Sequence, residues 1–253
     1  MSKIAVVTGG ASGIGEATAR RFAAAGWMIE IGDRDAERGN VIASELGATF
    51  RALDVASEAS VNAYATDILG RRGQVDAVIN SAGVLQNAVR ITEMDMEEFD
   101  RIHAINVRGS LLINRVFGRA MSAAGSGAII NMASLTTYRP SGQPAYAMGK
   151  VSIKMMTEIM AAEFGPSGVR VNAVAPGYVL TPAMQARIDS GLRDPKLIIE
   201  KSALRRFVQP ADVGEAIFFL CSDAASAITG VTLPIDCGWL ATSAYTSYAA
   251  VPA

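Results

Sequence analysis

The sequence predicts an α/β fold with a doubly wound parallel sheet of about seven strands and helices on both faces. Seven short apolar runs recur along the chain, and segments with helical spacing of apolar residues lie between most of them. Such alternation implies parallel strands joined by right-handed crossovers. The expected strands cover residues 4–7, 28–31, 49–53, 75–79, 128–132, 169–174 and 231–235. The clearest expected helices cover residues 14–25, 61–69, 105–121 and 146–164.

Length and composition favour a single domain over residues 1–253 and exclude several classes of function. A chain of 253 residues fits one large core, half of its residues are hydrophobic, and its formal net charge is -1. It therefore lacks the basic field that gathers nucleic acid or anionic lipid. No signal-peptide pattern opens the chain, and no apolar run reaches the roughly 18 residues of a membrane span. We expect a cytoplasmic protein without a membrane or nucleic-acid partner.

Cysteine and histidine usage argues against a metal centre and against a serine hydrolase. Cys221 and Cys237 stand outside any CxxC or Cys/His cluster, so we expect no metal and interpret both as buried free thiols. His103 is the only histidine, and no nucleophile elbow lies near it. A packed or surface histidine is therefore the simpler interpretation.

Two segments depart from the alternation of strands and helices. Residues 178–207 form an irregular stretch with prolines and glycines in or beside it, which predicts a mobile lid; an ordinary surface loop is the alternative. Ligands bind at the carboxyl ends of the strands in such a sheet, so the lid would cover them. The tail, residues 241–253, is small and polar, and we expect a loose end.

A glycine-rich stretch, TGGASGIG at residues 8–15, follows the first expected strand and runs directly into a helix. Without Cβ atoms the backbone can take positive φ and approach a pyrophosphate, and the helix amino terminus directs free N–H groups at it. A plain tight turn is the alternative, but the position between strand and helix favours a phosphate site and a Rossmann-type fold. The candidate phosphate-binding residues are Gly9, Ser12, Gly13, Ile14 and Gly15.

The second expected strand ends in Gly32, Asp33 and Arg34, at the interval typical of a ribose-binding acid. A carboxylate at this position accepts hydrogen bonds from the ribose hydroxyls and repels the 2′-phosphate of NADP. Arg34 could pair with that phosphate, cover the adenine or remain a solvated charge. We expect NAD as the cofactor, with NADP as the less favoured alternative.

Tyr146 and Lys150 lie one turn apart at the start of the expected helix 146–164. An ammonium beside a phenol favours the phenolate, so the pair can supply an acid/base group near neutral pH. Lowering the phenol pKa from about 10 by three units requires roughly 4 kcal/mol. Lys150 and the positive nicotinium ring of bound NAD are candidate sources of that stabilisation.

Ordered motifs along almost the whole chain resemble those of the short-chain dehydrogenase/reductase family, in its compact subtype with a TGxxxGxG loop. The motifs are TGGASGIG at 8–15, Asp54 after the third strand, NSAG at 80–83, Asn106, Ser134, YAMGK at 146–150 and PGYVLT at 176–181. The resemblance implies an oxidoreductase that moves a hydride between a nicotinamide and an alcohol or carbonyl carbon.

The resemblance also implies a role for each of four catalytic residues. Tyr146 would exchange the proton of the substrate oxygen, and Ser134 would hydrogen-bond that oxygen. Lys150 would lower the phenol pKa and bind the nicotinamide ribose, and Asn106 would hold a water on the proton path. Taken singly, Ser134 or Asn106 is more often a cap or turn residue.

The remaining cofactor contacts come from the loops that follow the later strands. Asp54 and Val55 would border the adenine, and Asn80, Ala82 and Gly83 would support the cofactor from the fourth strand. The nicotinamide carboxamide would be located by Pro176, Gly177, Val179 and Thr181.

Three positions depart from the family pattern. Ser81 replaces a commoner asparagine, which changes little. The spacing from Ser134 to Tyr146 is one residue shorter than in many relatives, so substrate contacts of this loop do not transfer. Cys237 stands where the family has a glycine, which leaves the local turn open but not the chemistry.

The expected substrate pocket mixes hydroxyl, amide and apolar groups, which suits a secondary alcohol, polyol or sugar and its ketone. Its candidate wall consists of Leu135, Thr136, Tyr138, Gln143, Tyr178 and residues 183–207. A 3-oxoacyl-thioester reductase is the alternative enzyme, because Arg139, Arg205 and Arg206 could bind a carrier phosphate, although Asp33 disfavours NADPH. A non-catalytic dinucleotide-sensing module is the alternative from another class, and the intact Tyr, Lys and Ser set argues against it.

The expected helix 146–164 carries more apolar residues than one buried stripe needs. Packing beneath the lid is one interpretation of the excess. Contact with a second copy is the other, and the family resemblance supports it. We expect a homo-oligomer, a tetramer or a dimer.

Overall fold

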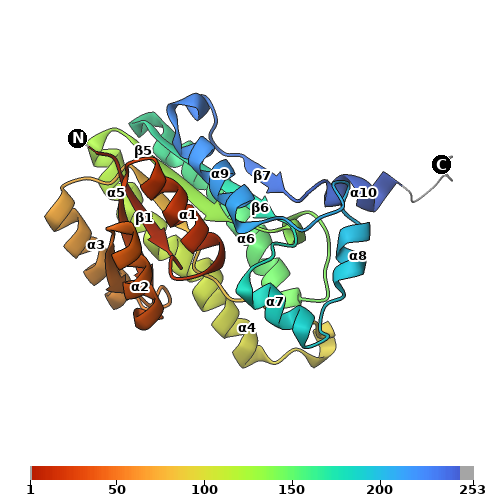
Figure 1. Ribbon diagram of the computed structural model, residues 1–253. Helices are drawn as coiled ribbons and strands as arrows, with labels where there is room; N and C mark the ends of the chain where they lie inside the picture. Colours follow the sequence, from red (N-terminus) through yellow and green to blue (C-terminus); the bar gives the residue numbers. More distant parts are fainter. Residues whose placement is uncertain (1, 246–253) are drawn as a thin grey trace.

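The computed structural model describes residues 2–245, and its centre is a seven-stranded sheet in the order β3-β2-β1-β4-β5-β6-β7 (Figure 1). Every neighbouring pair is parallel, which confirms the predicted fold class. The strands are β1 (Ile4–Thr8), β2 (Met28–Asp33), β3 (Thr49–Ala52), β4 (Ala77–Asn80), β5 (Gly127–Met132), β6 (Val169–Pro176) and β7 (Thr232–Ile235).

The strand order reverses at β1, which pairs with β2 on one side and with β4 on the other. Thr8, the last residue of β1, lies opposite Gly32 of β2 and Asn80 of β4. The chain therefore continues from β1 toward one edge of the sheet and from β4 toward the other. A crevice opens at this switch point, where ligands bind in sheets of this topology.

Helices cover both faces of the sheet (Figure 1). One face packs against α1 (Gly13–Ala24), α2 (Ala36–Leu46) and α9 (Pro210–Cys221), and the other against α3 (Glu58–Arg72), α5 (Ser110–Ala124) and α6 (Pro144–Phe164). Alternate side chains of β1 point into the cores on the two faces of the sheet. Val7 belongs to the core that contains Phe22 and Ile217, and Val6 belongs to the core that contains Phe117. Both faces of β1 are thus fully buried, as its unbroken apolar run predicts.

Helix boundaries follow local chemical signals. The Asp35 side chain accepts a hydrogen bond from Arg38 N at the start of α2, and Gly47 ends that helix at a φ of 62°. Proline occupies the first turn of α6, α7 (Pro182–Asp189), α8 (Pro195–Glu200) and α9. Short 3₁₀ turns cover Ile91–Glu93, Leu135–Thr137, Gly165–Ser167 and Asp223–Ala225.

The expected helix at 105–121 is part of a longer helical stretch. It begins with α4 (Met96–His103), passes through a π-helical turn at Ala104–Gly109 and continues as α5. His103 stacks on Phe99 with ring centroids 4.1 Å apart, and its Nε2 lies 3.1 Å from the Ala145 carbonyl. The packed interpretation of this histidine is therefore confirmed.

Two expectations about irregular structure are wrong. Residues 178–207 contain α7 and α8, because Thr181 and Asp194 cap them and Pro182 and Pro195 start helices rather than break them. The tail is helical at α10 (Trp239–Tyr245), where Asp236 accepts hydrogen bonds from the backbone just before and within the helix. The remainder of that tail, residues 246–253, lies outside the described residues.

The two cysteines differ. Cys221 is a buried free thiol, as expected, whereas Cys237 is only partly buried. Cys237 has a φ of 52°, so it keeps the left-handed backbone for which a glycine is better suited. No helix within residues 2–245 combines the length and apolar character needed to cross a bilayer.

Candidate functional site

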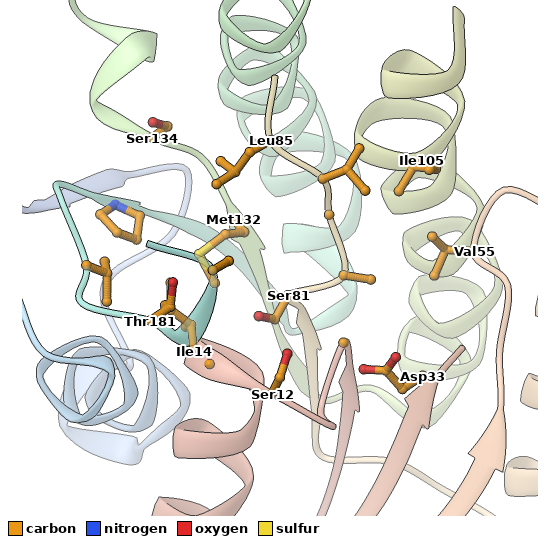
Figure 2. A pocket seen from close by; sticks show the side chains of 18 of the residues that line it. Ser12, Ile14, Asp33, Val55, Ser81, Leu85, Ile105, Met132, Ser134 and Thr181 are labelled. Carbon is orange, nitrogen blue, oxygen red and sulfur yellow. The ribbon is translucent and has the colours of Figure 1, made fainter. Parts of the chain in front are cut away.

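A cavity of about 410 Å³ lies at the carboxyl ends of the strands, where the sheet order reverses (Figure 2). Asp33 and Ser134 lie toward opposite ends of it, so the cavity is elongated. The predicted site residues that line it are Gly9, Ser12, Gly13, Ile14, Asp33, Arg34, Asp54, Val55, Ala82, Gly83, Ser134, Tyr146, Lys150, Pro176, Gly177, Val179 and Thr181. The tertiary structure thus gathers most of the predicted set around one space.

The glycine loop forms one wall of this cavity. Gly9 and Gly13 have φ values of 68° and 56°. A Cβ on Gly9 would lie 2.7 Å from the backbone of Ala82, so only glycine lets the loops after β1 and β4 approach. Ser12 precedes α1 without a side-chain capping bond, which leaves the first N–H groups of α1 available to an anion.

Gly15 does not line the cavity, and its contact with the cofactor stays a prediction. A Cβ at this position would lie 2.0 Å from the Gly9 carbonyl oxygen. The residue must therefore be small so that the loop can fold back on the first turn of α1. Its role is to shape the phosphate loop from behind.

Asp33 closes one end of the cavity at the tip of β2. Its Oδ2 accepts a hydrogen bond from Ala11 N at 3.0 Å, and its Oδ1 accepts one from Asp35 N at 3.1 Å. These bonds hold the carboxylate between the glycine loop and α2. The side chain of the neighbouring Arg34 is exposed and also lines the cavity.

Ser134, Tyr146 and Lys150 meet at the other end. Lys150 is 5% exposed, its Nζ donates to the Met132 carbonyl at 2.6 Å, and it lies 5.3 Å from the centre of the Tyr146 ring. Ser134 follows β5, and its Oγ accepts a hydrogen bond from Thr136 N at 3.3 Å. The end of β5 and the first turns of α6 therefore hold a hydroxyl, a phenol and an ammonium together.

Burial dominates the acid/base behaviour of this group. It raises the pKa of Tyr146, while a hydrogen bond with Ser134 and the positive charge of Arg187 act in the opposite direction. Burial lowers the pKa of Lys150 to about 8. Burial thus favours the neutral phenol and the neutral amine. A group that binds the phenolate or the ammonium would shift the corresponding pKa in the opposite direction.

Asn80 and Asn106 do not line the cavity. Asn80 is buried, and its Nδ2 donates to the side chains of Asn114 and Asn131, so it links strands and helices beneath the site. The Asn106 amide donates to Val84 O at 2.9 Å and accepts from Val84 N at 2.8 Å. Both ends of its side chain therefore contact the loop after β4, and the family-implied role of Asn106 in holding a water stays a prediction.

Gln86 is a site residue that the sequence did not indicate, and Arg187 belongs to the segment 183–207 that the sequence indicated only as a whole. Gln86 is fully buried, and its Oε1 accepts from the backbone N–H of Tyr146 at 3.2 Å, at the free amino end of α6. Its carbonyl oxygen accepts from Arg187 at 3.3 Å and from Gln143. A buried glutamine in a loop has no local signal, because its partners lie 57 to 101 positions away along the chain.

A second cavity of about 130 Å³ adjoins the first beside Ser134 and Tyr146. Leu135, Thr136, Gln143 and Tyr178 line it as expected. Tyr138 does not, because its hydroxyl donates to the Thr232 carbonyl at 2.7 Å.

The three arginines considered for binding a carrier phosphate do not lie at the same site. Arg139 lines the second cavity, whereas Arg205 and Arg206 do not. Arg205 donates to the Glu200 carbonyl, and Arg206 pairs with Asp212 at 2.6 Å. Of the three candidate phosphate contacts, only Arg139 therefore lies at the second cavity.

The first cavity fits a nicotinamide dinucleotide at both ends. One end offers the uncapped start of α1 and a ribose-side carboxylate, and the other a phenol beside a buried ammonium. Asp33 and Ser134 mark these two ends in Figure 2.

Comparison with known proteins agrees with this geometry. Residues 9–240 match a family model described as Enoyl-(Acyl carrier protein) reductase. The D-threitol dehydrogenase of Mycolicibacterium smegmatis is 38% identical over 94% of this chain and 92% of its own length. The cis-4-hydroxycyclohexanecarboxylate dehydrogenase of Sinomonas cyclohexanicum is 37% identical over 94% of this chain and 97% of its own.

A solved structure of ElxO with NADP bound superposes with a TM-score of 0.90 and 30% identity, over 95% of this chain and all of that one. The match covers the same elements that hold the predicted motifs.

Proposed function

The chain belongs to the short-chain dehydrogenase/reductase family and is an oxidoreductase of alcohols or polyols; we propose that it uses NAD(H), with Tyr146 as the acid/base residue. A nicotinamide cofactor supplies the site that accepts or releases a hydride. The observation that carries the residue assignment is the meeting of Ser134, Tyr146 and Lys150 at one end of the dinucleotide cavity. Their roles follow from the atoms that each exposes there.

The Tyr146 hydroxyl takes the proton of the substrate hydroxyl during oxidation and returns it during reduction. Ser134 donates a hydrogen bond to the same substrate oxygen and so orients the reacting carbon. Lys150 holds the nicotinamide ribose and, when protonated, stabilises the phenolate. Gln86 accepts the Tyr146 N–H and fixes the start of α6, so it is a positioning residue.

The choice of NAD over NADP rests on Asp33. Its carboxylate is held at the tip of β2 by two backbone N–H groups, and a 2′-phosphate placed there would meet a fixed negative charge. Arg34 is exposed beside it and is the residue through which NADP would be accommodated. Because the similar ElxO structure contains NADP, the preference of this protein between NAD and NADP is the first property to measure.

A polyol, sugar or other secondary alcohol fits the lining of the second cavity better than an acyl thioester on a carrier. Thr136, Gln143 and Tyr178 offer hydrogen-bonding groups to hydroxyls. The names of the threitol and hydroxycyclohexanecarboxylate dehydrogenases favour the same class. The 3-oxoacyl alternative retains only Arg139 of its three expected phosphate contacts.

Three architectural proposals accompany this function. Residues 2–245 act as a single domain, because one sheet and its two helical layers connect all elements. The segment 178–207, with α7 and α8, serves as the substrate lid over the cavities that Met184 lines. Helix α6 has an apolar outer face, because Val151, Met155 and Ile159 are 50 to 56% exposed. This face forms the contact between copies in a homo-oligomer, a dimer or tetramer.

Hydride transfer tests the proposal directly. The purified protein is incubated with NAD⁺ or NADP⁺ and a panel of polyols, simple secondary alcohols and hydroxyacyl thioesters, and formation of the reduced nicotinamide is followed. We expect turnover of a polyol or secondary alcohol with NAD⁺ as the better cofactor. Tight NADH binding without turnover of any panel member would instead support a dinucleotide sensor.

A further inference from the structure

Three arginines line the second cavity, and none of its lining residues within the described range 2–245 is acidic. They are Arg139, Arg187 and Arg193, contributed by the loop after β5, by α7 and by the turn between α7 and α8. The cavity opens directly onto the reacting groups, because Leu85, Ser134 and Tyr146 line both cavities. Positive charge is therefore concentrated where the substrate extends away from the nicotinamide.

None of the three forms an ion pair with a carboxylate of residues 2–245. Arg139 donates to Tyr138 O at 3.0 Å, Arg187 to Gln86 O at 3.3 Å and Arg193 to Leu192 O at 2.9 Å. These neutral acceptors orient the guanidinium groups without cancelling their charge. Most N–H donors of each fork remain available to another acceptor.

Arg187 is the centre of the group. Burial and the nearby charge of Arg193 lower its pKa, so like charges are held together in a partly buried place. Two further donors among the lining residues, Thr136 Oγ1 and Trp239 Nε1, are buried without a partner. Such a collection of unpaired donors is complementary to the oxygens of an anion.

From this arrangement we propose that the substrate carries an anionic group, a carboxylate or a phosphate, which Arg187 and Arg193 bind while its reacting hydroxyl lies at Ser134 and Tyr146. The inference rests on the proposed dehydrogenase function and narrows its substrate class to acidic alcohols, such as sugar acids or polyol phosphates. Arg139, which is exposed at the rim, adds electrostatic attraction. Planar guanidinium forks favour carboxylate and phosphate over neutral hydroxyls.

Matched substrates test the charge directly. Wild-type enzyme with NAD⁺ is assayed on gluconate against gluconamide, threonate against threonamide, and sorbitol 6-phosphate against sorbitol. We expect kcat/KM for at least one anionic member to exceed that of its neutral partner by about tenfold or more. The first two pairs isolate a carboxylate and the third a phosphate, so the better pair identifies the anion.

Arg187→Gln and Arg193→Gln each remove one charge from the cavity. We expect the anionic-to-neutral ratio of kcat/KM to fall about tenfold to a hundredfold in Arg187→Gln, and in the same direction in Arg193→Gln. Using the ratio cancels any effect of Arg187 on Tyr146, which changes both members equally. Arg101→Gln is the control, because this exposed α4 side chain lines neither cavity, and its ratio should match the wild type.

Binding supplies a readout that does not need turnover. The thermal midpoint of the NADH-loaded enzyme should rise with gluconate or sorbitol 6-phosphate more than with the neutral partner, and this difference should disappear in Arg187→Gln. Equal kcat/KM for charged and neutral members in the wild type, or equal loss for both in the two variants, overturns the anion subsite alone. Absence of hydride transfer to every alcohol, neutral ones included, overturns the proposed function instead.

Discussion

Lys150 holds its ammonium 5.3 Å from the centre of the Tyr146 ring, one turn farther along α6. Burial favours the neutral form of both residues, raising the pKa of the phenol and lowering that of the amine to about 8. The pair is therefore arranged for proton exchange rather than for a permanent ion pair. Its behaviour is open to direct test, and so are the cofactor and interface assignments.

Tyr146→Phe removes the hydroxyl that exchanges the substrate proton and leaves the ring in place. We expect kcat to fall about 10²- to 10⁴-fold, because general acid/base catalysis contributes on this scale. NADH affinity, measured by fluorescence titration, should change little. Tyr138→Phe is the matched control, since that hydroxyl bonds the Thr232 carbonyl outside both cavities, and equal activity of Tyr146→Phe and wild type would contradict the assignment.

Lys150→Met should stabilise the cofactor-free protein while abolishing turnover. A lysine pKa lowered from 10.5 to about 8 by burial costs the folded state roughly 3 kcal/mol near neutral pH. The variant also loses the hydrogen bond to the Met132 carbonyl, which stabilises the wild type by about 1 kcal/mol. The free energy of unfolding of Lys150→Met should therefore exceed that of the wild type by roughly 2 kcal/mol. Denaturant titrations of wild type and variant near neutral pH measure this difference.

The pH dependence of that gain has a defined sign. Because the folded pKa lies below the unfolded one, the cost is complete below about pH 8, shrinks as the pH rises and is absent above 10.5. The advantage of Lys150→Met should therefore decrease between these values. Lys154→Met, at an exposed position of the same helix, should leave stability nearly unchanged at either pH. A gain independent of pH would argue against burial as its cause.

Asp33→Asn should shift cofactor preference toward NADP(H). The amide keeps one oxygen, enough for one of the two backbone N–H groups that bond Asp33, and no longer repels a 2′-phosphate. We expect the ratio of kcat/KM for NADPH to that for NADH to rise about tenfold or more, equivalent to 1.4 kcal/mol. Glu37→Gln, on α2 but outside the cavity, should leave the ratio unchanged. An unaltered ratio in Asp33→Asn would remove this residue from cofactor selection.

Met155→Glu should break the proposed contact between copies. Met155 lies on the apolar outer face of α6 and is 54% exposed, so a carboxylate there would be desolvated on association. Light scattering coupled to gel filtration should show a smaller particle than the wild type. Val41→Glu is the control, since this exposed α2 residue belongs to the opposite helical layer, and unchanged mass in both variants would exclude α6 as the interface.

Much of the fold could be predicted because its signals are local. The apolar run of β1 and the periodicity of α1 are readable over a few residues each, and every expected strand is present. The errors at α7, α8 and α10 have a common cause. Prolines and small polar residues indicate irregular structure when they are considered alone, whereas Pro182, Pro195 and the side chain of Asp236 start or cap these helices.

Contacts between side chains and residues far away in the chain could not be predicted from the sequence. Asn106 carries a family signature, yet its amide is occupied by the backbone of Val84. Arg187 lies in the expected wall segment 183–207, but its hydrogen bond to the Gln86 carbonyl joins residues 101 positions apart. Neither contact follows a helical or strand period, so no pattern in the sequence could report it.

The sequence by itself determined the positions of the strands, the phosphate loop and the pairing of Tyr146 with Lys150, because each depends on neighbours within one or two turns of chain. Only the tertiary structure decided that Arg139, Arg187 and Arg193 share one cavity without an acidic partner. The physical reason is that charge compensation is a property of space: an arginine is paired or unpaired according to what folds against it.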